Sequence, residues 1–252
     1  MKHLTVLFLL LFILISGVTY LYVNGSEALD TLAKYQQQHP FSEQEMTFRS
    51  TERAFFNHGL ILHGPTFPAL PFKYKVDRLT LSSTPTRIKM RLNGVVIDIA
   101  NTLLEKKGNE IPHLFRQITD AEDLLLHPLE AMPLLNRDTF SGNICFTIKF
   151  SEKGPQLTII VEEKNKPIIK FQTILMEQPS HGLWDWVKTP FQVVQLSIYD
   201  QTLNQAIASY LQAIQHPLSK ELKKAITTAQ PYSKAIQLSD PISLSDMFQI
   251  KE

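Results

Sequence analysis

The clearest pattern in the chain is an alternation of apolar and polar residues over 88–99. Apolar residues occupy even positions from 88 to 92 and odd positions from 95 to 99, with Asn93-Gly94 between the two runs. This arrangement is typical of a two-residue type I′ turn. We therefore expect a β-hairpin that turns at Asn93-Gly94 and places Lys89 opposite Asp98 on its polar face.

The same alternation predicts a three-strand meander further along the chain. Its strands cover 144–150, 157–161 and 169–175, and the turn-forming stretches SEKGPQ and EKNKP separate them. Other strand-like segments follow the same rule of period two. They cover 46–62, 73–81 and 192–199.

Helical spacing appears in three places. Asp200 is expected to cap a helix with apolar residues at helical spacing through Ile214, and Ser219 is expected to begin a second helix. A helical insertion is predicted at 101–132, where Pro112 suits a first turn and Thr119 opens a capping box.

These elements predict an α+β fold. An N-terminal transmembrane helix is followed by an antiparallel, meander-rich sheet of about eight or nine strands packed with C-terminal helices. The expected organisation is an α+β domain over 46–230 and a C-terminal tail over 231–252. Alternation, rather than continuous apolar runs, leaves one sheet face open to water.

The first residues predict a membrane anchor. Residues 4–23 carry no charge and, as a helix, would span roughly 30 Å, the apolar thickness of a bilayer. Lys2 precedes the run and acidic residues follow it, so the expected orientation is a single-pass anchor (1–23) in the inner, cytoplasmic membrane with the remaining domain on the periplasmic or exterior side. Residues 24–45 are expected to form a stalk. Cleavage near 26–28, as in a signal peptide, is the alternative.

Composition narrows the function classes. A formal net charge of +1 argues against a nucleic-acid binder, which neutralises phosphates with an excess of basic residues. The single cysteine, Cys145, stands in an alternating strand and is interpreted as a packing residue.

No sequence motif indicates catalysis, a cofactor or a metal. HExxH, paired CxxC, a phosphate-binding glycine loop and GxSxG are all absent. Ser180-His181 with Asp185 is the nearest approach to a catalytic triad, but closeness in sequence is not triad geometry. The acidic cluster beginning at Asp120 is interpreted as a solvated first helical turn rather than a metal or acid–base site.

Trp184 and Trp186 are the candidate contact residues. Two positions apart in the stretch HGLWDWVKTPF, they would face the same way in an extended loop. They are interpreted either as a contact with a membrane or partner, or as packing over the edge of the core.

Three segments resemble envelope-facing proteins of the AsmA-like group. They are GLILHGPTFPALPFKYKVDRLTL, TPTRIKMRLNGVVIDIA and VVQLSIYDQTLNQAIASYL, which follow the N-terminal apolar run. The resemblance implies a non-enzymatic role in the bacterial envelope.

The expected function is therefore non-catalytic binding of a protein partner, or of an apolar ligand or lipid, near the inner membrane. The alternative is an envelope hydrolase with dispersed residues around His181, His58 or His63.

Overall fold

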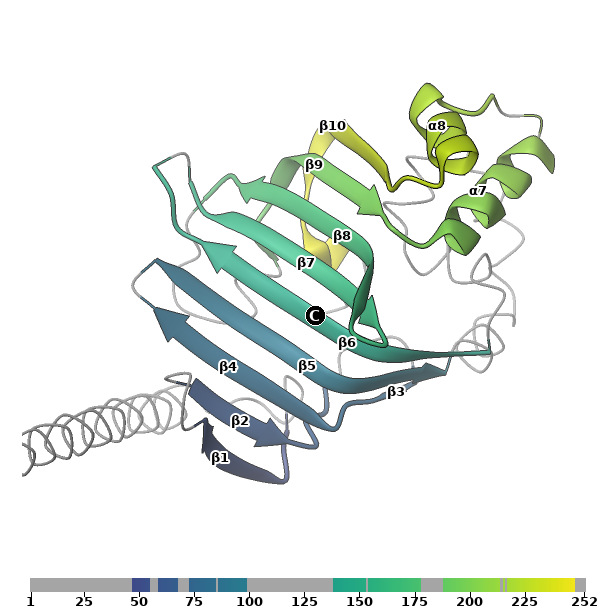
Figure 1. Ribbon diagram of the computed structural model, residues 1–252. Helices are drawn as coiled ribbons and strands as arrows, with labels where there is room; N and C mark the ends of the chain where they lie inside the picture. Colours follow the sequence, from purple (N-terminus) through teal and green to yellow (C-terminus); the bar gives the residue numbers. More distant parts are fainter. Residues whose placement is uncertain are drawn as a thin grey trace, which may run out of the picture.

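The protein is described by a computed structural model over residues 47–54, 59–67, 73–84, 86–98, 138–152, 154–177, 188–213, 215 and 217–247. These residues form an open antiparallel sheet of ten strands in the order β1-β2-β4-β5-β6-β7-β8-β9-β10, with β3 paired to β5 (Figure 1). The strands are β1 (Ser50–Ala54), β2 (Gly59–His63), β3 (Tyr74–Lys75), β4 (Arg78–Thr84), β5 (Arg87–Asp98), β6 (Thr139–Lys149), β7 (Gln156–Glu163), β8 (Lys166–Leu175), β9 (Phe191–Ile198) and β10 (Tyr232–Ile242).

Three helices follow or flank the last two strands. They are α7 (Gln201–Ala213), α8 (Lys220–Thr228) and α9 (Leu244–Met247). Asp200 and Ser219 cap α7 and α8 as the sequence predicts, because the carboxylate accepts from the Thr202 N–H at 2.8 Å and the hydroxyl accepts from the Leu222 N–H at 3.2 Å. Both helices lie at the β9–β10 end of the sheet (Figure 1).

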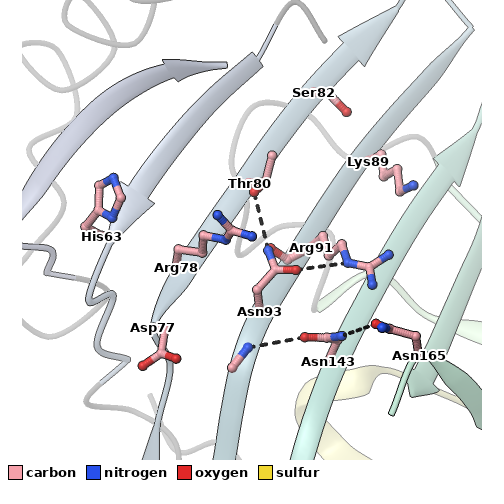
Figure 2. A pocket seen from close by; sticks show the side chains of 11 residues that line it. His63, Asp77, Arg78, Thr80, Ser82, Lys89, Arg91, Asn93, Asn143 and Asn165 are labelled. Carbon is pink, nitrogen blue, oxygen red and sulfur yellow. Dashed lines mark hydrogen bonds between the residues drawn. The ribbon is translucent and has the colours of Figure 1, made fainter. Parts of the chain in front are cut away.

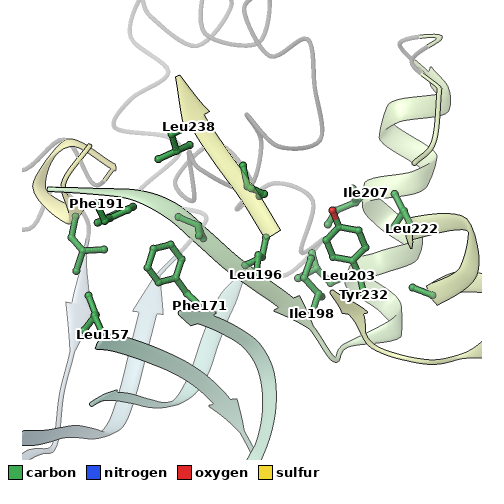
Figure 3. Close-up of a cluster of buried hydrophobic side chains, with 14 of the residues drawn as sticks. Leu157, Phe171, Phe191, Leu196, Ile198, Leu203, Ile207, Leu222, Tyr232 and Leu238 are labelled. Carbon is green, nitrogen blue, oxygen red and sulfur yellow. The ribbon is translucent and has the colours of Figure 1, made fainter. Parts of the chain in front are cut away.

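The predicted meander is confirmed. β6, β7 and β8 pair in sequence, with Ile148 opposite Leu157 and Ile159 opposite Phe171. Their apolar side chains join those of β9, β10, α7 and α8 in the largest core cluster, where the rings of Phe171 and Phe191 meet edge-on at 5.4 Å (Figure 3). The core therefore lies on one face of the sheet, and the face of β4, β5 and β6 that carries Arg78, Lys89 and Arg91 is mainly polar.

The predicted hairpin at Asn93-Gly94 is wrong. β5 continues through both residues and pairs with β6 on each side of them, Leu92 with Ile144 and Val95 with Gly142. Two residues of β5 thus lie opposite one residue of β6, which is a β-bulge. Gly94 has φ of +61°, and the bulge keeps the apolar side chains of β5 on the core face.

Two other strand assignments differ from the pattern. The strand-like segment over 46–62 contains β1 and most of β2, an antiparallel pair that places Glu52 beside Ile61. In the stretch interpreted as a tail, β10 pairs with β9 and buries Ile236 and Leu238.

The α+β fold class is wrong for the part of the chain that the structure describes. Strands make up 57% of it and helices 19%, so the fold is mainly antiparallel sheet with three short helices. The two longer helices are still short, since α7 has 13 residues and α8 has 9.

The predicted single-pass anchor is not supported. No helix among the described residues is both long and apolar enough to cross a membrane. The segments interpreted as anchor (1–23), stalk (24–45) and helical insertion (101–132) lie outside the described residues. The predicted inner-membrane location depended on this anchor and is likewise not supported.

Candidate functional site

The polar face of β4 and β5 carries the candidate site. Side chains alternate between the two faces of a strand, so those of Arg78, Thr80 and Ser82 point away from the core formed by Leu79. Their cross-strand partners on β5 are Asn93, Arg91 and Lys89. Figure 2 shows these side chains gathered on one surface of the sheet.

An open hollow of about 870 Å³ lies over this surface. Every side chain that lines it is polar or charged. The lining residues come from β2, β4, β5, β6 and two turns: His63, Asp77, Arg78, Thr80, Ser82, Lys89, Arg91, Asn93, Gly94, Asn143 and Asn165.

Arg91 is held in place by two neighbours. Its Nε donates to Asn93 Oδ1 at 3.0 Å, and its Nη2 donates to Glu162 Oε2 at 2.7 Å. The Glu162 side chain is 17% exposed and that of Arg91 is 31% exposed, so water screens this ion pair only partly. The guanidinium is therefore oriented before any ligand arrives.

A chain of amide groups forms another side of the hollow. Asn143 Oδ1 accepts from the Gly94 N–H at 3.2 Å, and Asn143 Nδ2 donates to Asn165 Oδ1 at 3.4 Å (Figure 2). Asn165 lies in the β7–β8 turn with φ of +61°, a conformation that asparagine tolerates. The bulge at Gly94 is thus tied to the neighbouring strand and turn.

The charges around the hollow are unequal. His63 pairs with Glu52 at 3.0 Å and Asp77 pairs with Lys75 at 3.4 Å. Arg78 and Lys89, in contrast, make no ion pair within the part of the chain that the structure describes. Three cationic side chains and one carboxylate line the hollow, so it is electropositive.

Tyr74 stabilises the opposite, apolar side of the same region. β3 pairs with β5 through Tyr74 and Ile97, and the tyrosine hydroxyl accepts a hydrogen bond from the Phe67 N–H. Burial raises the pKa of Tyr74, and this hydrogen bond partly opposes the rise. The phenol is therefore neutral at physiological pH.

The side chains that line the hollow are suited to binding groups rich in oxygen atoms. Arginine and lysine N–H groups donate to carboxylate and phosphate oxygens. Neither His63 nor Asp77 hydrogen-bonds to Thr80 or Ser82, so these lining residues do not form a nucleophile–base pair. Among the described residues, no group of three or more His, Cys, Asp or Glu is placed to hold a metal ion.

Of the candidate functional residues named from the sequence, the structure describes His63 and Cys145. Trp184 and Trp186 lie outside the described residues, as do the Ser180-His181-Asp185 set, the acidic cluster at Asp120 and His58. His63 lines the hollow but pairs with Glu52. Cys145 is buried in β6, as expected.

Sequence reasoning missed Arg78, Lys89 and Arg91. The signal for Lys89 and Arg91 was present, because cations alternate with apolar residues in the stretch RIKMR. The predicted hairpin paired Lys89 with Asp98. In the structure, Lys89 instead lies between Ser82 and Thr147 of the adjacent strands.

No protein-family model matches the chain, and no curated protein or solved structure shows significant similarity to it.

Proposed function

We propose that the protein is a non-catalytic binding module that holds a protein partner on the polar face of its sheet. The observation that carries the proposal is the hollow over β4, β5 and β6, which is lined by polar and charged side chains and opens on the face opposite the core. A surface of pre-oriented hydrogen-bonding groups on a rigid sheet is suited to recognition.

The lining chemistry favours a protein partner over an apolar ligand. Sites for apolar molecules are lined mainly by aliphatic and aromatic side chains, which exclude water from the ligand. The hollow offers guanidinium, ammonium, amide and hydroxyl groups instead. Such groups pair with the main chain and polar side chains of another polypeptide.

Site-specific photo-crosslinking in cells that make the protein tests this proposal. A photoreactive amino acid replaces Ser82 or Thr147, which flank Lys89 on the polar face. The matched control replaces Glu221, an exposed residue on α8. Circular dichroism confirms that each variant folds.

We expect both polar-face positions to crosslink the same protein, and the α8 position not to crosslink it. The proposal is contradicted if the polar-face positions yield no protein adduct, or if all three positions yield the same set of adducts.

A further inference from the structure

A line of cations runs along the polar face of β5. Arg87, Lys89 and Arg91 are two residues apart, so their side chains emerge on the same face. Lys89 and Arg91 line the hollow, and Arg87 continues the line toward the end of the strand.

The neighbouring strands extend this line. Arg78 of β4 lies opposite Asn93, and Lys149 of β6 lies opposite Arg87. Directly opposed residues of antiparallel strands share a face. At positions 87, 89, 91 and 93 of β5, either the β5 residue or its partner on a neighbouring strand is therefore a cation. We call this set, Arg78, Arg87, Lys89, Arg91 and Lys149, the cationic strip.

The strip has a regular spacing. Residues two apart on a strand are separated by ~7 Å, so its successive positions cover ~20 Å along β5. Within the described ranges, Arg91 is the one member that has an ion pair, with Glu162. The other members have no carboxylate partner there, and their mutual repulsion is relieved only by water, salt or a bound anion.

We propose that the cationic strip binds an acidic segment of the partner protein in an extended conformation, with carboxylates at alternate positions. This inference rests on the proposed function and names the chemistry of the partner. An extended chain repeats its side chains on one face every ~7 Å, which is the spacing of the strip. One carboxylate then meets each cationic position. At Arg91, which already pairs with Glu162, it meets guanidinium N–H groups that this pair does not use.

Spacing and composition favour a peptide over other anions. A single phosphate group is too small to reach both Arg78 and Lys89, whose positions are two repeats apart along the strands. Single-stranded nucleic acid is usually held by aromatic rings that stack on its bases. No described residue on the polar face of β4, β5 and β6 beside the strip is aromatic.

Polar groups beside the strip complement a peptide main chain. The Ser82 hydroxyl, which can both donate and accept, makes no hydrogen bond within the described part of the chain. Asn165 accepts from Asn143, and its own amide N–H groups donate no hydrogen bond to any described residue. A peptide presents both donors and acceptors, whereas a phosphate at neutral pH is mainly an acceptor.

Binding of synthetic peptides to the full chain tests the inference. One fluorescent peptide has aspartate at every second position. A second has the same composition with its aspartates contiguous, and a third has asparagine in place of aspartate. We expect the alternating peptide to bind most tightly, and its affinity to fall as salt rises to about 0.5 M. Equal affinity for the alternating and contiguous peptides would overturn the proposed spacing.

Paired charge variants locate the binding. Arg78→Gln with Lys89→Gln removes two unpaired cations from the strip, and Lys223→Gln with Lys224→Gln removes two from α8. We expect the first pair to weaken the alternating peptide by about tenfold, as for two exposed ion pairs, and the second by less than about twofold. Similar losses in both pairs would overturn the inference, as would tighter binding of an oligothymidylate of equal charge.

The crosslinking experiment separates failure of this inference from failure of the proposed function. Mass spectrometry of the adducts at Ser82 and Thr147 identifies the crosslinked segment of the partner. An acidic segment supports the inference. A segment without acidic residues overturns it and leaves the binding function standing, whereas absence of any adduct from the polar face overturns both.

Discussion

Gly94 lines the hollow and adopts a backbone conformation that favours glycine. Its φ of +61° is a conformation that residues with a Cβ rarely adopt. A Cβ atom at this position would also lie 2.1 Å from Asp77 Oδ2. Asp77 occupies the space that glycine leaves and joins β3 to β4 next to the bulge.

Gly94→Val is therefore expected to destabilise the protein by at least ~1–2 kcal/mol, because it combines left-handed strain with a clash. Chemical denaturation of the full chain measures the loss. In the double variant Asp77→Ala/Gly94→Val, removal of the clashing side chain should recover part of it, since the two sites interact. An unchanged unfolding midpoint for Gly94→Val would contradict the bulge.

Tyr74 gives a pH-dependent prediction at the same scale. Burial raises its pKa above the usual value of 10.0, so the folded state holds the phenol proton more tightly than the unfolded chain does. The resulting stability is complete below pH about 10 and is lost as pH rises through the folded-state pKa. Tyr74→Phe should show a shallower loss of stability with alkaline pH than the wild type. Parallel curves for the two proteins would exclude this contribution.

At the scale of elements, the bulge shows why the alternation over 88–99 is compatible with two structures. A two-residue hairpin and a one-residue bulge both move the apolar positions from even to odd numbers. Asn-Gly suits either structure, because both the type I′ turn and this bulge place the glycine at positive φ. What decided between them is pairing with β6, which is distant in sequence and follows the whole of β5. Local pattern therefore predicted the strands and their apolar face, but not the turn.

The end of α8 offers a second test of element geometry. Ala229 has φ of +52° at the C-terminal cap, where glycine is favoured. Ala229→Gly should stabilise the protein by about 0.5–1 kcal/mol, measured by denaturant unfolding. As a control, Ala225→Gly within the buried part of the same helix should destabilise it by about 1 kcal/mol or more. A loss of stability in Ala229→Gly would contradict the left-handed cap.

At the scale of the whole molecule, the core face was more predictable than the site. Alternation in β6, β7 and β8 predicted which apolar side chains lie on the core face, because period two follows directly from strand geometry. The hollow depends on neighbours from separate strands, such as Arg78 beside Asn93, and sequence alone did not supply that register. β10 was missed because its apolar residues are scattered and Pro241 interrupts the pattern.

The place of β10 in the core can be tested directly. Ile236 is 3% exposed and lies opposite Val194 of β9, whereas its neighbour Gln237 is exposed. Ile236→Ala should cost ~2–5 kcal/mol of unfolding free energy, and Gln237→Ala should change it by less than ~0.5 kcal/mol. Equal, small effects of the two substitutions would mean that β10 does not complete the core.

The central claim is that the polar face of β4, β5 and β6 is the binding surface. Amide chemical-shift mapping of the full chain, titrated with the alternating acidic peptide, tests it most directly. We predict shifts concentrated at positions on the hollow and cationic strip, including Thr80, Lys89 and Asn143, with α7 and α8 unchanged. Shifts confined to the helices, or spread evenly over the molecule, would contradict the claim.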